Sequence, residues 1–117
     1  MSRILLVEDD PDVRLLMEHI LLDAGYEVDV AGSMTGGGEL LGSRSYDLVI
    51  ADGRLPDGNG MAVADKAREG GVKALVVTGY ALSLPVEVID RYEILLKPLR
   101  PRELIDAVER TLGEVGE

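Results

Sequence analysis

The sequence predicts an α/β protein in which helices cover both faces of a doubly wound, five-stranded parallel sheet. Short apolar segments alternate with segments whose apolar residues recur at helical spacing, an order that favours parallel strands joined by right-handed crossovers. Polar and charged residues gather directly after the apolar segments, where such sheets bind ligands. Because 117 residues are typical of one domain, we treat residues 1–117 as a single domain.

Five segments are predicted to be strands because they are short and mostly apolar. The runs ILLV and ALVV show no polar alternation, which is typical of strands buried on both faces. The predicted strands are Ile4–Val7, Glu27–Ala31, Asp47–Ala51, Ala74–Val77 and Glu93–Leu96.

Four segments are predicted to be helices. A further helix is expected between the fourth and fifth strands, but its helical pattern is weak. The first has a clear apolar stripe that includes Leu16, Met17 and Ala24, and the second contains three consecutive glycines that should make it the least stable. The stretch GYALSLPVEVIDRY has a proline in its middle and no sustained stripe, so we expect a short or irregular fourth helix there. The clear helices are Pro11–Ala24, Ser33–Leu41, Met61–Glu69 and Pro101–Leu112.

Composition excludes several classes of function. The chain has no cysteine, which rules out disulfides and thiolate chemistry and suits a reducing cytoplasm. We expect no signal peptide and no membrane span. A formal net charge of −10 disfavours direct binding of nucleic acid or an anionic membrane, and it favours cations and basic partner surfaces.

The stretch EDDPD after the first strand places four carboxylates in a short space. Asp10 suits a helix N-cap, Pro11 suits the first helical position, and Asp12 suits the positive end of the helix dipole. Glu8 and Asp9 have no such structural explanation. If Asp52 at the end of the third strand joins them, two carboxylates about 4 Å apart repel by roughly 4 kcal/mol at an effective dielectric constant of about 20. A bound Mg²⁺ would remove this cost, and a raised carboxyl pKa is the alternative.

The stretch DGRLPDGNG, from Asp52 to Gly60, allows three interpretations. It contains two turn signals, and Asp57 is expected to be a solvated loop residue. A calcium loop is disfavoured because Met61 stands where an acid or amide is required. In the third interpretation Asp52 is a nucleophile, while Lys97 and Thr78 at neighbouring strand ends balance and hydrogen-bond a phosphoryl group.

Five motifs at successive strand ends resemble the receiver domain of two-component response regulators, the CheY-like family. The resemblance covers essentially the whole chain, and it implies a flavodoxin-like (βα)5 fold with strand order 2-1-3-4-5 and a Lys-Pro bond that is usually cis. The motifs are Glu8-Asp9, Asp52, Leu55-Pro56, Thr78-Gly79 and Lys97-Pro98.

The resemblance also implies a role for each residue of the acidic edge. Asp52 would accept phosphate from the phosphohistidine of a sensor histidine kinase or a histidine phosphotransfer protein. Asp9 and Asp52 would bind Mg²⁺ directly, together with the backbone carbonyl of Arg54. Glu8 would act on the cation through a water molecule.

The same resemblance makes the chain a switch that catalyses only its own phosphorylation and dephosphorylation. Thr78 and Lys97 would contact the phosphoryl group and shift when it is present. A downstream protein would bind the face formed by the fourth helix, the fifth strand and the fifth helix, and the protein would be a monomer or weak dimer.

The chain departs from the family pattern near this output face. Ile94 stands where the family has an aromatic switch residue, and the segment between Thr78 and Lys97 is short by about a turn. The stretch VVTGY partly resembles a Thr-Gly-Tyr subgroup of single-domain regulators. We therefore expect Tyr80, or the segment 80–91, to replace the missing aromatic. The expected switch residues are Gly79, Tyr80, Ile94 and Pro98.

Two alternative functions remain open at this point. A small Mg²⁺-dependent phosphatase would use similar strand-end residues, but such enzymes usually need a second Asp two positions after the nucleophile, where this chain has Arg54. A phosphate-independent interaction domain with the same fold would have lost the acid pair, the Asp or the Lys, and all are present. A flavin-binding domain needs a phosphate-cradling loop after the first strand, where carboxylates stand instead.

Overall fold

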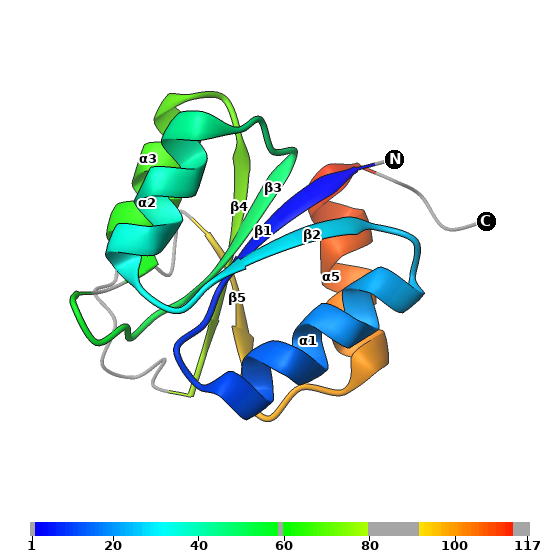
Figure 1. Ribbon diagram of the computed structural model, residues 1–117. Coiled ribbons are helices and arrows are strands. Elements are labelled where there is room, and N and C mark those ends of the chain that lie inside the picture. The colour runs from blue at the N-terminus through cyan, green and yellow to red at the C-terminus, as the bar shows by residue number, and fades with distance from the viewer. Residues whose placement is uncertain (1, 59, 80–91, 114–117) are drawn as a thin grey trace.

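Five parallel strands form one sheet in the order β2-β1-β3-β4-β5, which confirms the expected topology (Figure 1). The structure is a computed structural model, and it describes residues 2–58, 60–79 and 92–113. The predicted strands are confirmed: β1 is one residue longer than predicted, β3 is shifted by one residue, and β4 is one residue longer at each end. Their bounds are β1 Arg3–Val7, β2 Glu27–Ala31, β3 Leu48–Asp52, β4 Lys73–Thr78 and β5 Glu93–Leu96.

The described helices cover the two faces of this sheet in pairs (Figure 1). Helices α1 and α5 pack on one face, and α2 and α3 pack on the other. The expected fourth helix falls in the segment 80–91, which lies outside the described residues. Among the residues that the structure describes, no helix is long and apolar enough to cross a membrane. The helices are α1 Pro11–Asp23, α2 Met34–Ser43, α3 Gly60–Glu69 and α5 Pro101–Leu112.

The core lies on both faces of the sheet, which explains the unbroken apolar run of the first strand. Ile4 and Leu6 pack into the cluster beneath α1 and α5, whereas Leu5 and Val7 pack into the cluster beneath α2 and α3. All four side chains are buried. A strand that is covered on both sides has no solvent-facing positions for polar residues.

The apolar stripe predicted for the first helix is narrower than expected. Met17 and Leu21 are buried, but the Leu16 side chain is 55% exposed and Ala24 lies at the exposed C-cap. Because α1 packs against both the sheet and α5, only the strip that faces the two of them is covered. Leu16 and Ala24, which belong to the apolar stripe of the sequence, therefore lie outside the core.

Candidate functional site

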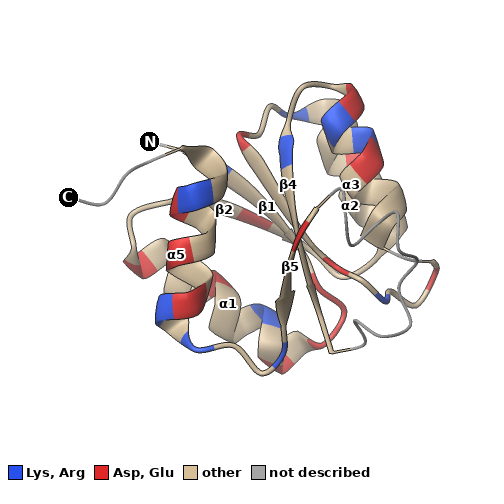
Figure 2. Cartoon of the chain, turned by 180° about the vertical axis from the view of Figure 1, so that it is seen from behind, with Lys and Arg blue, Asp and Glu red and all other residues tan. Residues whose placement is uncertain are grey.

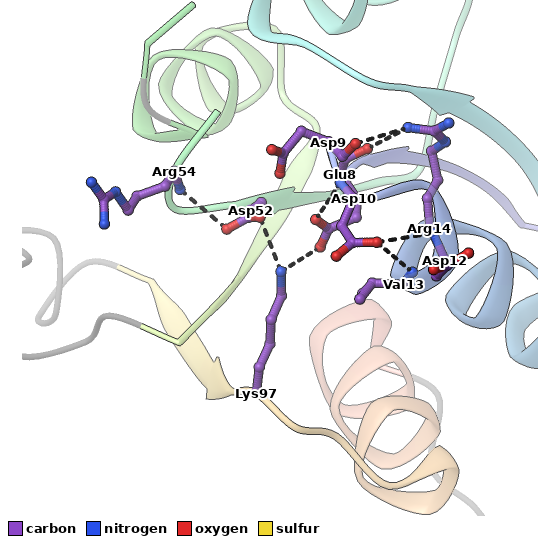
Figure 3. Close-up of polar contacts among 9 residues, drawn as sticks. All are labelled: Glu8, Asp9, Asp10, Asp12, Val13, Arg14, Asp52, Arg54 and Lys97. Carbon is purple, nitrogen blue, oxygen red and sulfur yellow. Dashed lines mark hydrogen bonds and ion pairs between the residues drawn. The ribbon is translucent and has the colours of Figure 1, made fainter. Parts of the chain in front are cut away.

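The carboxyl ends of β1 and β3 lie side by side and carry the acidic residues. Val7 of β1 pairs with Ala51 of β3, so Glu8 and Asp52 are the residues that directly follow this pair on neighbouring strands. Lys97 follows β5 and reaches back toward the same point (Figure 3). Together these segments line a cleft of about 370 Å³. Its lining residues are Glu8, Asp9, Asp10, Asp52, Arg54, Leu55, Pro56 and Lys97.

Three carboxylates come together in this cleft, as the sequence predicted. One oxygen atom of each of Glu8, Asp9 and Asp52 lies within 4.8 Å of the others. Glu8 is 1% exposed and Asp52 is 6% exposed, whereas Asp9 is exposed at the mouth of the cleft. Hard oxygen donors at this spacing are the ligands that Mg²⁺ prefers, so the residues present fit such an ion.

Lys97 partly balances the charge of the two buried acids. Its Nζ atom lies 2.6 Å from Glu8 Oε1 and 3.0 Å from Asp52 Oδ2. Burial raises the pKa of Glu8 to about 7, and this effect exceeds the lowering by Lys97. Burial alone would lower the pKa of Lys97, but its bonds to the two carboxylates raise it overall. Both ways of relieving acid crowding considered from the sequence therefore have support: burial raises the pKa of Glu8, and the three carboxylates fit a bound Mg²⁺.

The loop between β1 and α1 is held by the Asp10 cap and by the Arg14 side chain, a contact that sequence reasoning missed. Asp10 caps α1 as predicted, accepting hydrogen bonds from the amides of Asp12 and Val13 at 2.9 and 3.3 Å. Arg14 Nη1 donates to the backbone carbonyl of Glu8 over 2.9 Å (Figure 3). A signal was available, because Arg14 stands one helical turn after the N-cap of the helix that the acids begin.

The loop after β3 contains one residue whose surroundings differ from the prediction. The Arg54 amide donates to Asp52 Oδ1 over 3.1 Å, while the Arg54 side chain is exposed and points away from Asp52 (Figure 3). Asp57 is exposed as expected, but it accepts hydrogen bonds from Met34 and Thr35 at the start of α2. The Thr35 hydroxyl, then the amides, lower the pKa of Asp57 to about 2.

The remaining predicted site residues lie at the ends of β4 and β5. Thr78 is fully buried as the last residue of β4, and its carbonyl accepts the Lys97 amide over 3.1 Å. The Lys97-Pro98 bond is cis. Ile94 packs against the cluster that contains Met61 and Val76. Gly79 is exposed directly after β4, and Tyr80 lies outside the described residues.

Comparison with known proteins gives one consistent family. A family model for the response regulator receiver domain matches residues 4–109. The response regulator receiver protein CpdR of Brucella abortus is 31% identical, covering 96% of this chain and 98% of that protein. The TorCAD operon transcriptional regulatory protein TorR of Escherichia coli is also 31% identical, but the chain spans about half of its length, 50%.

Solved structures show the same relationship. A CheY-like receiver domain protein from Methanospirillum hungatei superposes with a TM-score of 0.88 at 32% identity, covering 97% of this chain and 95% of that one. The response regulator TrrA of Thermotoga maritima, solved in complex with Mg²⁺ and BeF, gives 0.85 at 31% identity, with 95% and 99% covered. The strand order, the acidic cleft and these matches show that the chain belongs to the response regulator receiver domain family of two-component signalling.

Proposed function

We propose that this chain is a phospho-accepting receiver in which Asp52 takes a phosphoryl group from a phosphohistidine. The donor is a sensor histidine kinase or a histidine phosphotransfer protein. One observation carries the proposal: Lys97 Nζ lies 3.0 Å from Asp52 Oδ2 in a cleft where Glu8 and Asp9 complete a cluster of three carboxylates. A nucleophilic carboxylate, a cation and a set of metal ligands are the parts that phosphoryl transfer needs.

Magnesium is the proposed cofactor. Asp9 and Asp52 would hold it directly with the backbone carbonyl of Arg54, and Glu8 would hold it through water. When bound, the cation neutralises charge on the transferring phosphoryl group. Support comes from the cluster itself and from TrrA, which was solved with Mg²⁺ and BeF. The Asp9 side chain has no hydrogen-bond or ion-pair partner within residues 2–58, 60–79 and 92–113, so its oxygens are available to a ligand.

The chemical step needs only positioning and charge from the protein. A carboxylate oxygen of Asp52 attacks phosphorus, the new P–O bond forms, the P–N bond to the donor histidine breaks, and the imidazole keeps the electron pair. Lys97 exchanges its ion pair with Asp52 for one with the phosphoryl group. The Thr78 hydroxyl, at the end of the neighbouring strand, donates a hydrogen bond to a phosphoryl oxygen. These contacts exist only in the phosphorylated form, so they bias the switch.

The output side of the proposal concerns the face that includes β5 and α5. A downstream protein would bind there, with Gly79, Tyr80, Ile94 and Pro98 changing conformation after phosphorylation. The domain would catalyse only its own phosphorylation and dephosphorylation, as a monomer or weak dimer. A cytoplasmic location remains a prediction that follows from the absence of cysteine.

Intact-mass spectrometry after incubation with acetyl phosphate and MgCl₂ tests the proposal. The protein should gain the mass of one phosphoryl group, and EDTA should prevent the gain. Asp52→Asn should remain unmodified, whereas Asp106→Asn, a change in a surface acid on α5, should leave the reaction intact. An unmodified wild-type protein, or a phosphorylated Asp52→Asn variant, would refute the assignment of Asp52.

A further inference from the structure

The loop after Asp52 is a narrow turn that hydrogen bonds close on itself. Leu55 and Gly58 exchange two backbone hydrogen bonds, of 3.0 and 3.2 Å. The Leu55 side chain is buried in the cluster beneath α2 and α3. Asp57 therefore stands at the tip of the turn, and Arg54, whose amide bonds to Asp52, stands at its base. Movement of the tip would move the backbone beside the phosphorylation site.

The tip is held by α2, a helix that supplies no residue to the acidic cleft. Asp57 Oδ1 accepts the Met34 amide over 2.8 Å. Asp57 Oδ2 accepts the Thr35 amide over 2.9 Å and the Thr35 hydroxyl over 2.7 Å. Ser33 accepts the next two amides of α2 through its side chain and its carbonyl. The amides of the first four residues of α2 are thus all paired, two of them with a residue from another loop.

Close packing accompanies these hydrogen bonds. A Cβ atom at Gly58 would lie 2.7 Å from the Met34 sulfur, so only a glycine fits there without displacing that side chain. We call the three hydrogen bonds from Met34 and Thr35 to Asp57 the α2 latch. These bonds, that of the Thr35 hydroxyl first, lower the pKa of Asp57 to about 2, so the carboxylate is ionised at neutral pH.

We propose that Thr35 and Asp57 are positioning residues for magnesium binding at Asp52. The α2 latch fixes the turn so that the Arg54 carbonyl can join Asp9 and Asp52 around the cation. This inference rests on the proposed function. Partners that orient a metal ligand typically change metal affinity by about 10–100-fold.

Thr35 offers a probe that separates geometry from charge. Loss of Asp57 would remove a hydrogen-bond acceptor and also a negative charge that attracts cations. Thr35→Val removes only the hydroxyl from the latch and leaves the charge and the β-branched shape in place. Thr35→Ser restores the hydroxyl, so a positioning role predicts that serine rescues what valine loses.

Isothermal titration calorimetry with MgCl₂ measures the effect without any need for phosphorylation. Thr35→Val should bind Mg²⁺ about tenfold more weakly than the wild type. Thr35→Ser should bind within about twofold of the wild type. Asp57→Asn should lose at least as much affinity as Thr35→Val. Hydrogen exchange should show faster exchange of the Met34 and Thr35 amides in Thr35→Val and Asp57→Asn.

A matched control lies at the other end of the same helix. The Ser43 hydroxyl donates to the carbonyls of Glu39 and Leu40 at 3.0 and 3.4 Å. Ser43→Ala should therefore weaken the end of α2 and leave magnesium affinity unchanged. The inference would be overturned if Thr35→Val and Asp57→Asn both bind magnesium with wild-type affinity, or if Ser43→Ala binds it more weakly. Either result would leave the proposed function standing. A wild-type protein that binds no magnesium would overturn the proposed function and the inference with it.

Discussion

At the scale of single residues, Glu8 shows most clearly how position changes chemistry. Its side chain is 1% exposed and lies against Asp52 in the acidic cluster, with Lys97 at 2.6 Å. Burial raises the pKa of Glu8 to about 7, although an exposed glutamate ionises near 4.5. Glu8 therefore keeps its proton at pH values where an exposed glutamate is already ionised.

The shifted pKa of Glu8 predicts an unusual pH dependence of stability. Between about pH 4.5 and about pH 7 the folded protein keeps the Glu8 proton while the unfolded chain has lost it. The folded state then binds more protons than the unfolded state. The contribution of Glu8 to the free energy of unfolding therefore falls as pH rises through this window. Urea unfolding in EDTA should show a lower midpoint at about pH 7.5 than at about pH 5.

The variant Glu8→Gln separates this effect from the titration of other acids. Glutamine resembles the protonated carboxyl group and cannot ionise, so most of the difference between the two pH values should disappear. A variant that keeps the full pH dependence would show that Glu8 is not its source.

At the scale of elements, α2 forms although three consecutive glycines lie in its first half. Gly37 is buried, and a Cβ atom there would meet Val7 Cγ2 of β1 at 2.9 Å and Val63 of α3 at 3.6 Å. Gly38, the next residue, would place its Cβ no closer than 3.7 Å to Lys66 Nζ. The helix therefore needs one glycine for close packing on the sheet, while its N-terminal amides are capped by Ser33 and Asp57.

This difference predicts opposite effects of alanine at two neighbouring positions. Gly38→Ala should raise the free energy of unfolding by about 1 kcal/mol, because alanine is the better helix former and has room. Gly37→Ala gains the same helix propensity, but its new Cβ must displace the stiff Val7 side chain, at an overpacking cost of about 1–3 kcal/mol. The free energy of unfolding should therefore fall by about 1 kcal/mol. Urea unfolding of the two variants measures this, and a stabilised Gly37→Ala would contradict the packing explanation.

At the scale of the whole molecule, the net charge is negative, and the acidic cleft differs from the rest of the surface in concentrating carboxylates at one place. The chain carries 22 acidic and 12 basic residues. On α3 and α5 the two signs are interspersed along the helix (Figure 2). At the cleft, in contrast, three carboxylates face one lysine. A monovalent salt screens the general repulsion, whereas the proposed divalent cation would also bind in the cleft.

Magnesium should therefore stabilise the protein more than sodium does at the same ionic strength. A ligand present at about 100 times its dissociation constant adds about 2.7 kcal/mol to the free energy of unfolding. Thermal unfolding in matched NaCl and MgCl₂ solutions measures the excess. Asp9→Asn, a change at an exposed position, should unfold like the wild type in NaCl and lose the magnesium excess. Equal stabilisation by the two salts would argue against a specific site.

Local sequence was sufficient to predict the strands, the four clear helices and the identity of the strand-end residues. Continuous apolar runs and helical stripes report burial directly, because each depends on neighbours within a few positions. The expected site residues Glu8, Asp9, Asp52 and Lys97 do meet in one cleft. That expectation succeeded because parallel strands place all their carboxyl ends on one edge, whatever lies between them in the chain.

Contacts that depend on how separate elements pack were not predictable in this way. Tyr92 hydrogen-bonds Asp65 on α3, and its ring centre lies 5.1 Å from the Arg68 guanidinium. Asp57, expected to be a solvated loop residue, caps a helix that begins 23 positions earlier. No local pattern links such residues.

The sequence by itself determined which chemical groups stand at the ligand-binding edge, because strand ends are marked by local changes from apolar to polar residues. Only the tertiary structure decided which of those groups form ion pairs or have shifted pKa values, and which contacts fix the loops that carry them. Burial at the end of β1 raises the pKa of Glu8, and Lys97, which reaches it from the end of β5, opposes that rise. The packing of α2 beside the β3–α3 turn made Asp57 its cap. Distances between residues far apart in the chain follow from packing, and packing is a property of the whole fold.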